Sequence, residues 1–390
     1  MRSVVTLAAS SIGRNLEVIA GRFHPPEQID AIHPIGSGNV NDTFLVRLAV
    51  ATTEGSEAFV MQRLNTDVFN RPDLVMGNLI ALGSHVQERM ATGMPELQGR
   101  RWEVPRVIPA RGDHGHWVEH EGQFWRSISY IDAAIAHDVI CDAKHAREVG
   151  YGLGTFHHLI SDLPVSQLAD TLEGFHVTPA YLDRYDLVLD RWLDRAEPRE
   201  VTESRLVSAL AFVADGRDGA DVLEAACQRG ELRRRPIHGD PKINNVMIDP
   251  GSGQAVGLID LDTVKPGLVH YDIGDCLRSC CNPVGEEVTD LTTVRFDLDL
   301  CRSILEGYLS VASSFLSPAD VAYLPACIRL IPFELGLRFL TDHLDGDRYF
   351  KVEKRGQNLD RALVQFSLMR SIEDQFEAIE SLVQQLTCPL

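Results

Sequence analysis

Hydrophobic and polar positions follow two different periods along this chain. Between residues 29 and 131, apolar side chains alternate with polar ones in short runs, a period of two that is typical of half-buried strands. From residue 144 onward, apolar side chains recur at three- and four-residue spacing, as in residues 144–159, 181–193 and 204–227. This second spacing is typical of amphipathic helices. The pattern predicts an α+β protein with strands first and helices after.

The N-terminal part predicts a helix followed by an antiparallel sheet. Residues 14–23 are amphipathic and end at a pair of prolines that a helix does not tolerate. Two extended runs then flank a Gly-rich turn at residues 36–41, and the run AFVMQRL makes a third strand. We expect a helix over residues 72–90, a strand over residues 104–110, and two later strands that end near residue 131.

The change from strands to helices places the expected domain boundary near Ala133. A chain of 390 residues is too long for one small core. We therefore predict an N-terminal lobe, residues 1–132, with an antiparallel sheet and one helix. A mostly helical C-terminal lobe follows over residues 133–390, and its last part, residues 358–386, predicts a long amphipathic closing helix.

The charge balance narrows the range of partners. The formal net charge is −19, from 37 Lys and Arg against 56 Asp and Glu. A surface this acidic repels the phosphates of nucleic acids and of anionic lipids. We therefore expect neither nucleic acid nor a membrane as a partner. The first residues contain no secretory core, and the eight cysteines show no metal-ligand spacing, which favours a reducing cytoplasm. The sequence leaves the oligomeric state open.

The stretch HGDPKINN carries the strongest chemical signal. It has an Asp two residues after a His, a Lys two further on and an Asn five after the Asp, which is the layout of a kinase catalytic loop. Phosphoryl transfer needs a carboxylate that holds and deprotonates the acceptor hydroxyl, a cation near the moving phosphoryl group and an amide oxygen on a metal ion. Asp240, Lys242 and Asn245 match these needs. His238 joins this catalytic set as a hydrogen-bonding brace for the loop.

A second acidic motif follows the catalytic loop. The runs VMID and AVGLIDLDTV predict two short strands joined by a tight turn, which would return Asp260 to the side of Asn245. Mg²⁺ that bridges ATP phosphates prefers hard oxygen ligands. We therefore predict that Asn245 and Asp260 bind Mg²⁺. Asp262 is either a further ligand or a group that supports one.

Three parts of the N-terminal lobe are candidates for nucleotide binding. Glycines in the turn would let backbone amides approach phosphates. The third strand has Gln where protein kinases carry a Lys for the α- and β-phosphates. Backbone groups at the end of the last strand are placed to meet adenine. The candidate nucleotide contacts are Gly36, Ser37, Gly38, Gln62, Tyr130 and Ile131.

A row of charges stands in an apolar helical segment, PFELGLRFLTDHLDGDRYF. Glu334, Arg338 and Asp342 are four residues apart and so share one face of a helix. An exposed charge ladder would have this spacing, but the segment is apolar nearly all round, which indicates burial. Buried charges need partners or a polar ligand. We therefore predict that Arg338 lines the acceptor cavity.

The motifs HGDPKINN, LIDLDT and HYDIGD resemble those of the aminoglycoside phosphotransferase and choline kinase superfamily, which has a protein-kinase-like fold of two lobes. A closer likeness, to the N-acetylhexosamine 1-kinases, is carried by GSGNVNDTFLV, MQRLNTDVF, YDIGDCLRS and ELGLRFLTDHLDGDRYF. The resemblance implies ATP and Mg²⁺ as cofactors. It also implies phosphorylation of the anomeric hydroxyl of an N-acetylated hexosamine.

The same resemblance implies roles for single residues. As the motifs already suggest, it makes Asp240 the catalytic base and Asn245 and Asp260 the metal ligands. It also makes Gln62 less unusual, because that family tends to carry Gln at this position. The sugar contacts that it implies are Asp240, Arg338 and Tyr349. Asn39, a further candidate substrate contact, departs from the family pattern because it stands where a His helps to hold the sugar.

Two alternatives to a sugar 1-kinase remain. In the first, the acceptor is choline-like, homoserine-like or an aminoglycoside, and such a cation needs a carboxylate-rich pocket. A nucleotide-binding pseudokinase is the other alternative, suggested by Gln62. The intact set of Asp240, Asn245 and Asp260 argues against it.

Overall fold

The computed structural model of this protein describes residues 11–36, 40–52, 55–93, 97, 99–112, 115–195 and 203–387. Its chain divides into two units. The first contains the residues up to Glu88 together with Glu103–Asp132, and the second contains Arg89–Trp102 together with the residues from Ala133 onward. The segment Arg89–Trp102, which our predicted division assigns to the N-terminal lobe, thus groups with the second unit.

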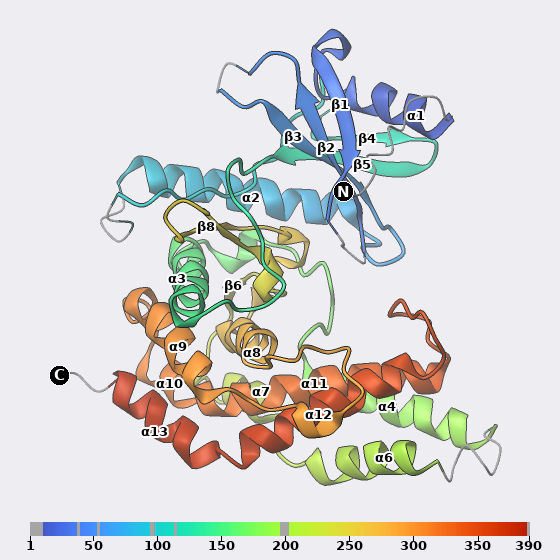
Figure 1. The fold of residues 1–390 in the computed structure, drawn as a ribbon, viewed down its shortest axis with the longest axis vertical. Coiled ribbons are helices and arrows are strands. Elements are labelled where there is room, and N and C mark those ends of the chain that lie inside the picture. Colours follow the sequence, from blue (N-terminus) through green and yellow to red (C-terminus); the bar gives the residue numbers. More distant parts are fainter. Residues whose placement is uncertain are drawn as a thin grey trace. The chain divides into compact units, whose positions relative to one another are not determined.

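The first unit is built on a five-stranded antiparallel sheet in the order β1-β2-β3-β5-β4 (Figure 1). Burial along β2 and β3 does not alternate strictly: Leu45 and Val46 are both buried, and so are all four residues of 58–61, so these strands are covered on both faces. In the register of β3 with β5, Gln62 lies opposite Arg126. The strands are β1 Ile29–Pro34, β2 Asp42–Leu48, β3 Ala58–Leu64, β4 Trp117–His120 and β5 Gln123–Ser129.

Helix α1, Ser11–Ala20, packs on one face of this sheet. Its apolar side chains share a buried cluster with Met61 of β3 and Trp125 of β5. Because successive side chains on a strand point to opposite faces, the neighbouring Gln62 and Arg126 project from the other face. The sheet thus separates an apolar core from a polar pair.

One strand prediction in this unit is wrong. Residues 104–110 form no ladder, and only Val107 pairs, in an isolated bridge with Ile128. The Arg106 N–H donates to the side chain of Ser129 and not to its carbonyl, and Pro105 and Pro109 beyond the bridge have no N–H to donate. The predicted helix is confirmed as α2, Pro72–Ala91.

The second unit is mostly helical and holds two small two-stranded sheets, of which one is a hairpin (Figure 1). Strand β6 (Arg235–Ile237) pairs with β9 (Lys265–Gly267), and β7 (Val246–Ile248) pairs with β8 (Ala255–Leu258). The α-helices described there are α3 Ala143–Ile160, α4 Thr178–Leu193, α6 Ser204–Gly216, α7 Val222–Gln228, α8 Val269–Cys280, α9 Leu298–Ala312, α10 Pro318–Ala322, α11 Leu324–Asp345, α12 Gln357–Glu373 and α13 Phe376–Thr387.

The predicted closing helix over residues 358–386 is interrupted. Helix α12 ends at Glu373 and α13 begins at Phe376. Gln375, between them, donates from its side-chain amide to the carbonyl of Phe296 at 3.0 Å. That long-range bond ties the interruption to the segment before α9.

Glycines allow α3 and α9 to approach at backbone distance. A Cβ added to Gly150 of α3 would lie 1.9 Å from the carbonyl oxygen of Ile304, and one added to Gly307 of α9 would lie 1.9 Å from that of Arg147. A side chain at either position would force the helices apart. This contact anchors α3 in the second unit.

No helix among the described residues is long and apolar enough to cross a membrane.

Candidate active site

The catalytic stretch follows β6, and its first residue bridges two motifs. His238 is fully buried. Its Nδ1 accepts the backbone N–H of Asp240 at 3.2 Å, so its Nε2 carries the proton and donates to the carbonyl of Ile259 at 3.0 Å. Burial lowers the pKa of His238, which agrees with a neutral ring. These contacts support the predicted bracing role, since one ring spans the segments that carry Asp240 and Asp260.

A buried carboxylate on α8 holds the backbone at the same turn. Asp272 accepts the N–H groups of His238 at 2.6 Å and Gly239 at 2.8 Å, and it contacts Nε2 of His157 at 2.8 Å. Gly239 has φ +89°, and a Cβ there would lie 2.6 Å from the carbonyl oxygen of Thr263. Glycine is therefore required by both conformation and space.

Asp240 is held at its backbone and at its carboxylate. Lys242 Nζ donates to its Oδ2 at 2.7 Å, and the Asn245 side-chain amide donates to its carbonyl oxygen at 2.7 Å. Burial lowers the pKa of Lys242, but Asp240, Asp260 and Asp275 outweigh that effect and raise it above its ordinary value. Lys242 thus stays cationic in a cluster of carboxylates, within reach of the predicted base.

The hairpin β7–β8 brings the predicted metal ligands together. The N–H of Ile259 donates to the carbonyl of Asn245 at 2.9 Å, so Asp260 follows directly after the residue opposite Asn245. Asp260 has φ +64°, a left-handed conformation in which its chain turns out of the strand. Amide and carboxylate oxygens at this position form the hard donor set that suits Mg²⁺. Asp262 is buried nearby, and its role stays a prediction.

A residue that the sequence analysis missed links this loop to α11. His176 contacts the carbonyl oxygen of Gly239 through Nε2 at 2.8 Å and Oε1 of Glu334 through Nδ1 at 2.9 Å. Both partners accept, so both ring nitrogens carry protons and the ring is cationic. Burial lowers the pKa of His176, but Glu334 outweighs this and raises it overall. His176 therefore forms a buried ion pair behind the catalytic loop.

The contacts of His176 also explain why sequence reasoning overlooked it. No motif surrounds it, and Glu334 lies far along the chain. Thr178 adds a hydroxyl bond to the other oxygen of Glu334 at 2.9 Å. The first charge of the row on α11 is thus satisfied inside the protein, close to the backbone of Asp240.

Arg338, the second charge of the row, lies among aromatic rings. Its guanidinium is 5.0 Å from the ring centre of Phe175, 5.2 Å from that of Tyr181 and 5.5 Å from that of Phe350. Cations interact favourably with ring faces at these distances. Burial raises the pKa of Tyr181 to about 12, so its hydroxyl remains protonated and able to donate. The arrangement supplies both polar and apolar surface.

Asp342, the third charge, has a structural task. Its carboxylate accepts the backbone N–H groups of Arg348, Tyr349 and Phe350 at 2.8–3.0 Å, and it also receives the side-chain amide of Asn358 at 2.9 Å. The Tyr349 side chain is 54% exposed, with its ring 4.8 Å from that of Phe350. Asp342 thus positions the loop that carries Phe350, one of the three rings near Arg338.

In the first unit, Gln62 is paired with a buried cation. Nε and Nη2 of Arg126 donate to Oε1 of Gln62 at 2.9 and 2.7 Å, and the Gln62 amide donates to the hydroxyl of Thr43 at 3.1 Å. Arg126 is 2% exposed. A cation therefore stands beside the position where kinases carry their Lys, supplied by β5 instead of β3. Strand register, which the sequence pattern does not define, was needed to find it.

The other predicted nucleotide contacts are described only in part. Gly36 has φ +76°, as a turn that favours glycine requires. Ser37, Gly38 and Asn39 lie outside the described residues. Tyr130 and Ile131 follow the end of β5, where the first unit ends after Asp132.

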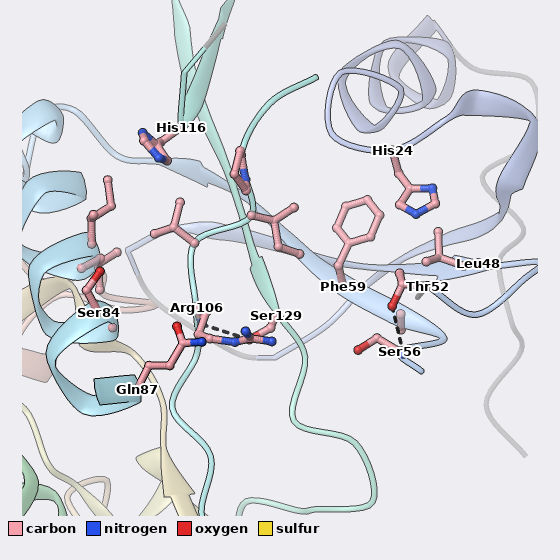
Figure 2. A pocket seen from close by; sticks show the side chains of 17 residues that line it. His24, Leu48, Thr52, Ser56, Phe59, Ser84, Gln87, Arg106, His116 and Ser129 are labelled. Atoms are coloured by element: carbon pink, nitrogen blue, oxygen red, sulfur yellow. Dashed lines mark hydrogen bonds between the residues drawn. The ribbon is translucent and has the colours of Figure 1, made fainter. Parts of the chain in front are cut away.

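A separate cavity of about 420 Å³ opens in the first unit (Figure 2). Its apolar wall includes Phe59, and its polar groups include His116 and Arg106. The N–H of Arg106 donates to the Ser129 hydroxyl at 2.9 Å (Figure 2). Of the predicted nucleotide contacts that the structure describes, Gly36, Gln62, Tyr130 and Ile131, none lines this cavity.

The chain matches one protein family and is similar in fold to several solved structures. A family model described as "Phosphotransferase enzyme family" matches residues 31–295. Among solved structures, an aminoglycoside phosphotransferase from Alicyclobacillus acidocaldarius is 18% identical with a TM-score of 0.55, and the match covers 95% of this chain and 96% of that chain.

Two eukaryotic kinases are similar to the chain over comparable lengths. For choline kinase from Cryptosporidium parvum the identity is 12%, the TM-score 0.58, and the coverage 95% of this chain and 97% of that one. For ethanolamine kinase from Plasmodium vivax the identity is 12% and the TM-score 0.55, and the match covers 92% of this chain and 91% of that one. At such identities the likeness concerns the fold, and it confirms the predicted protein-kinase-like fold class.

Proposed function

The chain belongs to the phosphotransferase enzyme family, and from this premise we propose that it transfers the terminal phosphoryl group of ATP to a hydroxyl of an N-acetylated hexosamine. Asp240 accepts a hydrogen bond from the acceptor hydroxyl and takes its proton as the phosphoryl group arrives. Lys242 offsets the negative charge on that group. The product is the sugar 1-phosphate when the anomeric hydroxyl is the acceptor.

Asn245 and Asp260 would hold a Mg²⁺ ion. When bound, Mg²⁺ neutralises phosphate charge and orients the phosphate chain. In the first unit, Arg126 beside Gln62 is a separate candidate contact for the nucleotide.

The observation that carries the acceptor assignment is the buried link from α11 to the catalytic loop. His176 contacts both Gly239 and Glu334, which places the start of the α11 charge row at the backbone next to Asp240. Arg338 stands one helical turn beyond Glu334. A neutral sugar suits this region, because Arg338 donates hydrogen bonds and the rings around it pack on the apolar face of a pyranose.

A cationic acceptor such as choline is the second candidate, favoured by the rings of Phe175, Tyr181 and Phe350. Such rings can bind ammonium groups. Here, however, the guanidinium of Arg338 already lies among them. The nearby carboxylate of Glu334 is likewise neutralised by His176. Repulsion from Arg338 therefore disfavours a cation.

A panel of acceptors tests the proposal. Purified protein with ATP and Mg²⁺ is assayed for ATP consumption with N-acetylhexosamines, simple hexoses, choline, ethanolamine, homoserine and aminoglycosides. We expect turnover with an N-acetylhexosamine and formation of an acid-labile 1-phosphate. Turnover only with a cationic acceptor would exclude the sugar assignment, and ATP binding without turnover on any compound would favour a pseudokinase.

A further inference from the structure

Three potential metal ligands converge at the start of α3, away from the catalytic loop. His137, Cys141 and His145 each offer one ligand atom, and these atoms all lie within 4.8 Å of one another. The first two residues belong to the loop before α3, and the third stands in the first helical turn. The cysteines show no metal-ligand spacing among themselves, but Cys141 has a histidine four residues before it and another four residues after it.

The contacts within this cluster show how the three groups face one another. Cys141 Sγ lies 3.6 Å from Nδ1 of His137, and the backbone N–H of Cys141 donates to Nδ1 of His145 at 3.1 Å. The two imidazole rings have centres 4.6 Å apart. The side chain of Asp142 accepts the backbone N–H of His145, which orients the start of the helix. One thiol and two imidazoles therefore surround a common point.

Zinc matches the chemistry of this donor set. It binds thiolate at about 2.3 Å and imidazole nitrogen at about 2.0–2.1 Å in tetrahedral geometry. Ligand atoms of such a site are separated by roughly 3.4–3.7 Å, and the 3.6 Å between Cys141 Sγ and His137 Nδ1 already lies in this range.

We propose that His137, Cys141 and His145 form a Zn²⁺ site that fastens the loop before α3 to the helix. The Cys141 thiol loses its proton to solvent as the Zn–S bond forms, and both histidines bind as neutral rings. The ion replaces the Cys141–His145 hydrogen bond as the link between loop and helix. Water occupies the fourth position of the tetrahedron.

The fastened loop also touches the strand that follows the catalytic residues. The N–H and carbonyl of Ile135 pair with the carbonyl and N–H of Ile248, each at 2.8 Å. Ile248 ends β7, three residues after Asn245. Zinc would therefore restrain a segment that supports the predicted metal ligand of the catalytic site.

Cobalt spectroscopy tests this site separately from the catalytic one. The full-length protein is titrated with Co²⁺ in excess Mg²⁺, which occupies oxygen-ligand sites. We expect one equivalent of Co²⁺ to produce a thiolate-to-metal charge-transfer band and visible bands of tetrahedral intensity, and one equivalent of Zn²⁺ to abolish both. Absence of the charge-transfer band in the wild-type protein would overturn the proposal.

Variants identify the ligands. Cys141→Ser should remove the charge-transfer band, and His137→Gln should weaken Zn²⁺ binding at least tenfold in competition with a chelator. The exposed Cys141 and the half-buried His137 are preferred to the buried His145, whose substitution endangers folding. Cys227→Ser, at another free cysteine, is the matched control and should keep the band. An unchanged band in Cys141→Ser would refute the site.

Discussion

Asp240 depends on several groups that hold it without reacting. Its N–H is bound by His238, its carbonyl by Asn245 and its carboxylate by Lys242. Catalysis of phosphoryl transfer rests mainly on positioning and electrostatics, so such contacts matter as much as the base itself. Substitutions at this scale should thus separate chemistry from binding.

Replacing Asp240 with Asn should remove turnover and spare nucleotide binding. The amide keeps the size of the side chain but cannot take a proton, so kcat should fall by about 10²–10⁴-fold. Steady-state kinetics and ATP titration calorimetry measure the two effects. Asp183→Asn, at an exposed position on α4, is the control. Activity above a tenth of wild type in Asp240→Asn would contradict the assigned role.

The buried pair of His176 and Glu334 should make stability depend on pH. The pKa of His176 is raised from 6.5 in the folded protein. A histidine whose pKa is raised on folding contributes its full stabilisation below pH 6.5. This contribution is lost as the pH rises through the pKa that the histidine has in the folded protein. Thermal unfolding of wild type and His176→Gln at several pH values should show the largest difference at low pH.

A difference between these two proteins that grows with pH would contradict a cationic His176. The steady-state kinetics of His176→Gln provide a second test. Because Nε2 contacts the carbonyl of Gly239, His176→Gln should lower kcat more than it raises KM for ATP.

Arg126 should act on the nucleotide from the sheet. Removing one charged hydrogen-bond donor costs about 1.5–3 kcal/mol, so Arg126→Gln should raise KM for ATP by roughly 10–100-fold with a smaller effect on the acceptor. Arg63→Gln on the opposite face of β3, where Arg63 pairs with Asp42 in solvent, is the matched control. Equal KM values for the two variants would exclude Arg126 from the nucleotide site.

At the scale of elements, short backbone distances hold the second unit together. Helices α3 and α9 meet at Gly150, Gly154 and Gly307, and α3 also carries Glu148, which accepts the N–H of Ala255 in β8 at 3.0 Å. The β7–β8 hairpin therefore rests on a helix whose place depends on glycine. Small changes in helix spacing should be transmitted to the hairpin.

Adding a methyl group at this contact should be costly. Gly307→Ala places a Cβ against the carbonyl of Arg147, and such overpacking costs about 1–3 kcal/mol in the free energy of unfolding. Gly77→Ala on α2, where a Cβ meets nothing within 4 Å, should instead stabilise by about 0.4–1 kcal/mol. Urea denaturation measures both. Equal stability of the two variants would show that α3 and α9 can separate freely.

At the scale of the whole molecule, the net charge affects the stability of the fold. A net charge of −19 produces self-repulsion, which dissolved salt screens. The Debye length shortens from about 30 Å at 0.01 M salt to about 8 Å at 0.15 M, so the unfolding temperature should rise by a few degrees over this range. Scanning calorimetry in NaCl and KCl checks this. A rise seen with only one of these salts would indicate ion binding instead.

Sequence and structure agree most where the determinants are local. The stretch HGDPKINN and the hairpin that returns Asp260 to Asn245 are short in sequence, so their spacing predicts their geometry. His176 and Arg126 were missed because each acts through a residue distant in sequence, Glu334 or Gln62. The strand expected over residues 104–110 failed since its prolines cannot pair. Long-range contacts thus supply what periodicity lacks.

The glycine contact between α3 and α9 bears on how the chain is made. Helix α3 ends at Ile160, but α9 begins only at Leu298. At about 5–20 residues per second, on the order of ten seconds pass between the emergence of the two helices from the ribosome. During that interval the face of α3 that α9 later covers stays exposed in the nascent chain. Co-expressed chaperones should therefore increase the yield of soluble protein, and the increase should be largest when translation is slow.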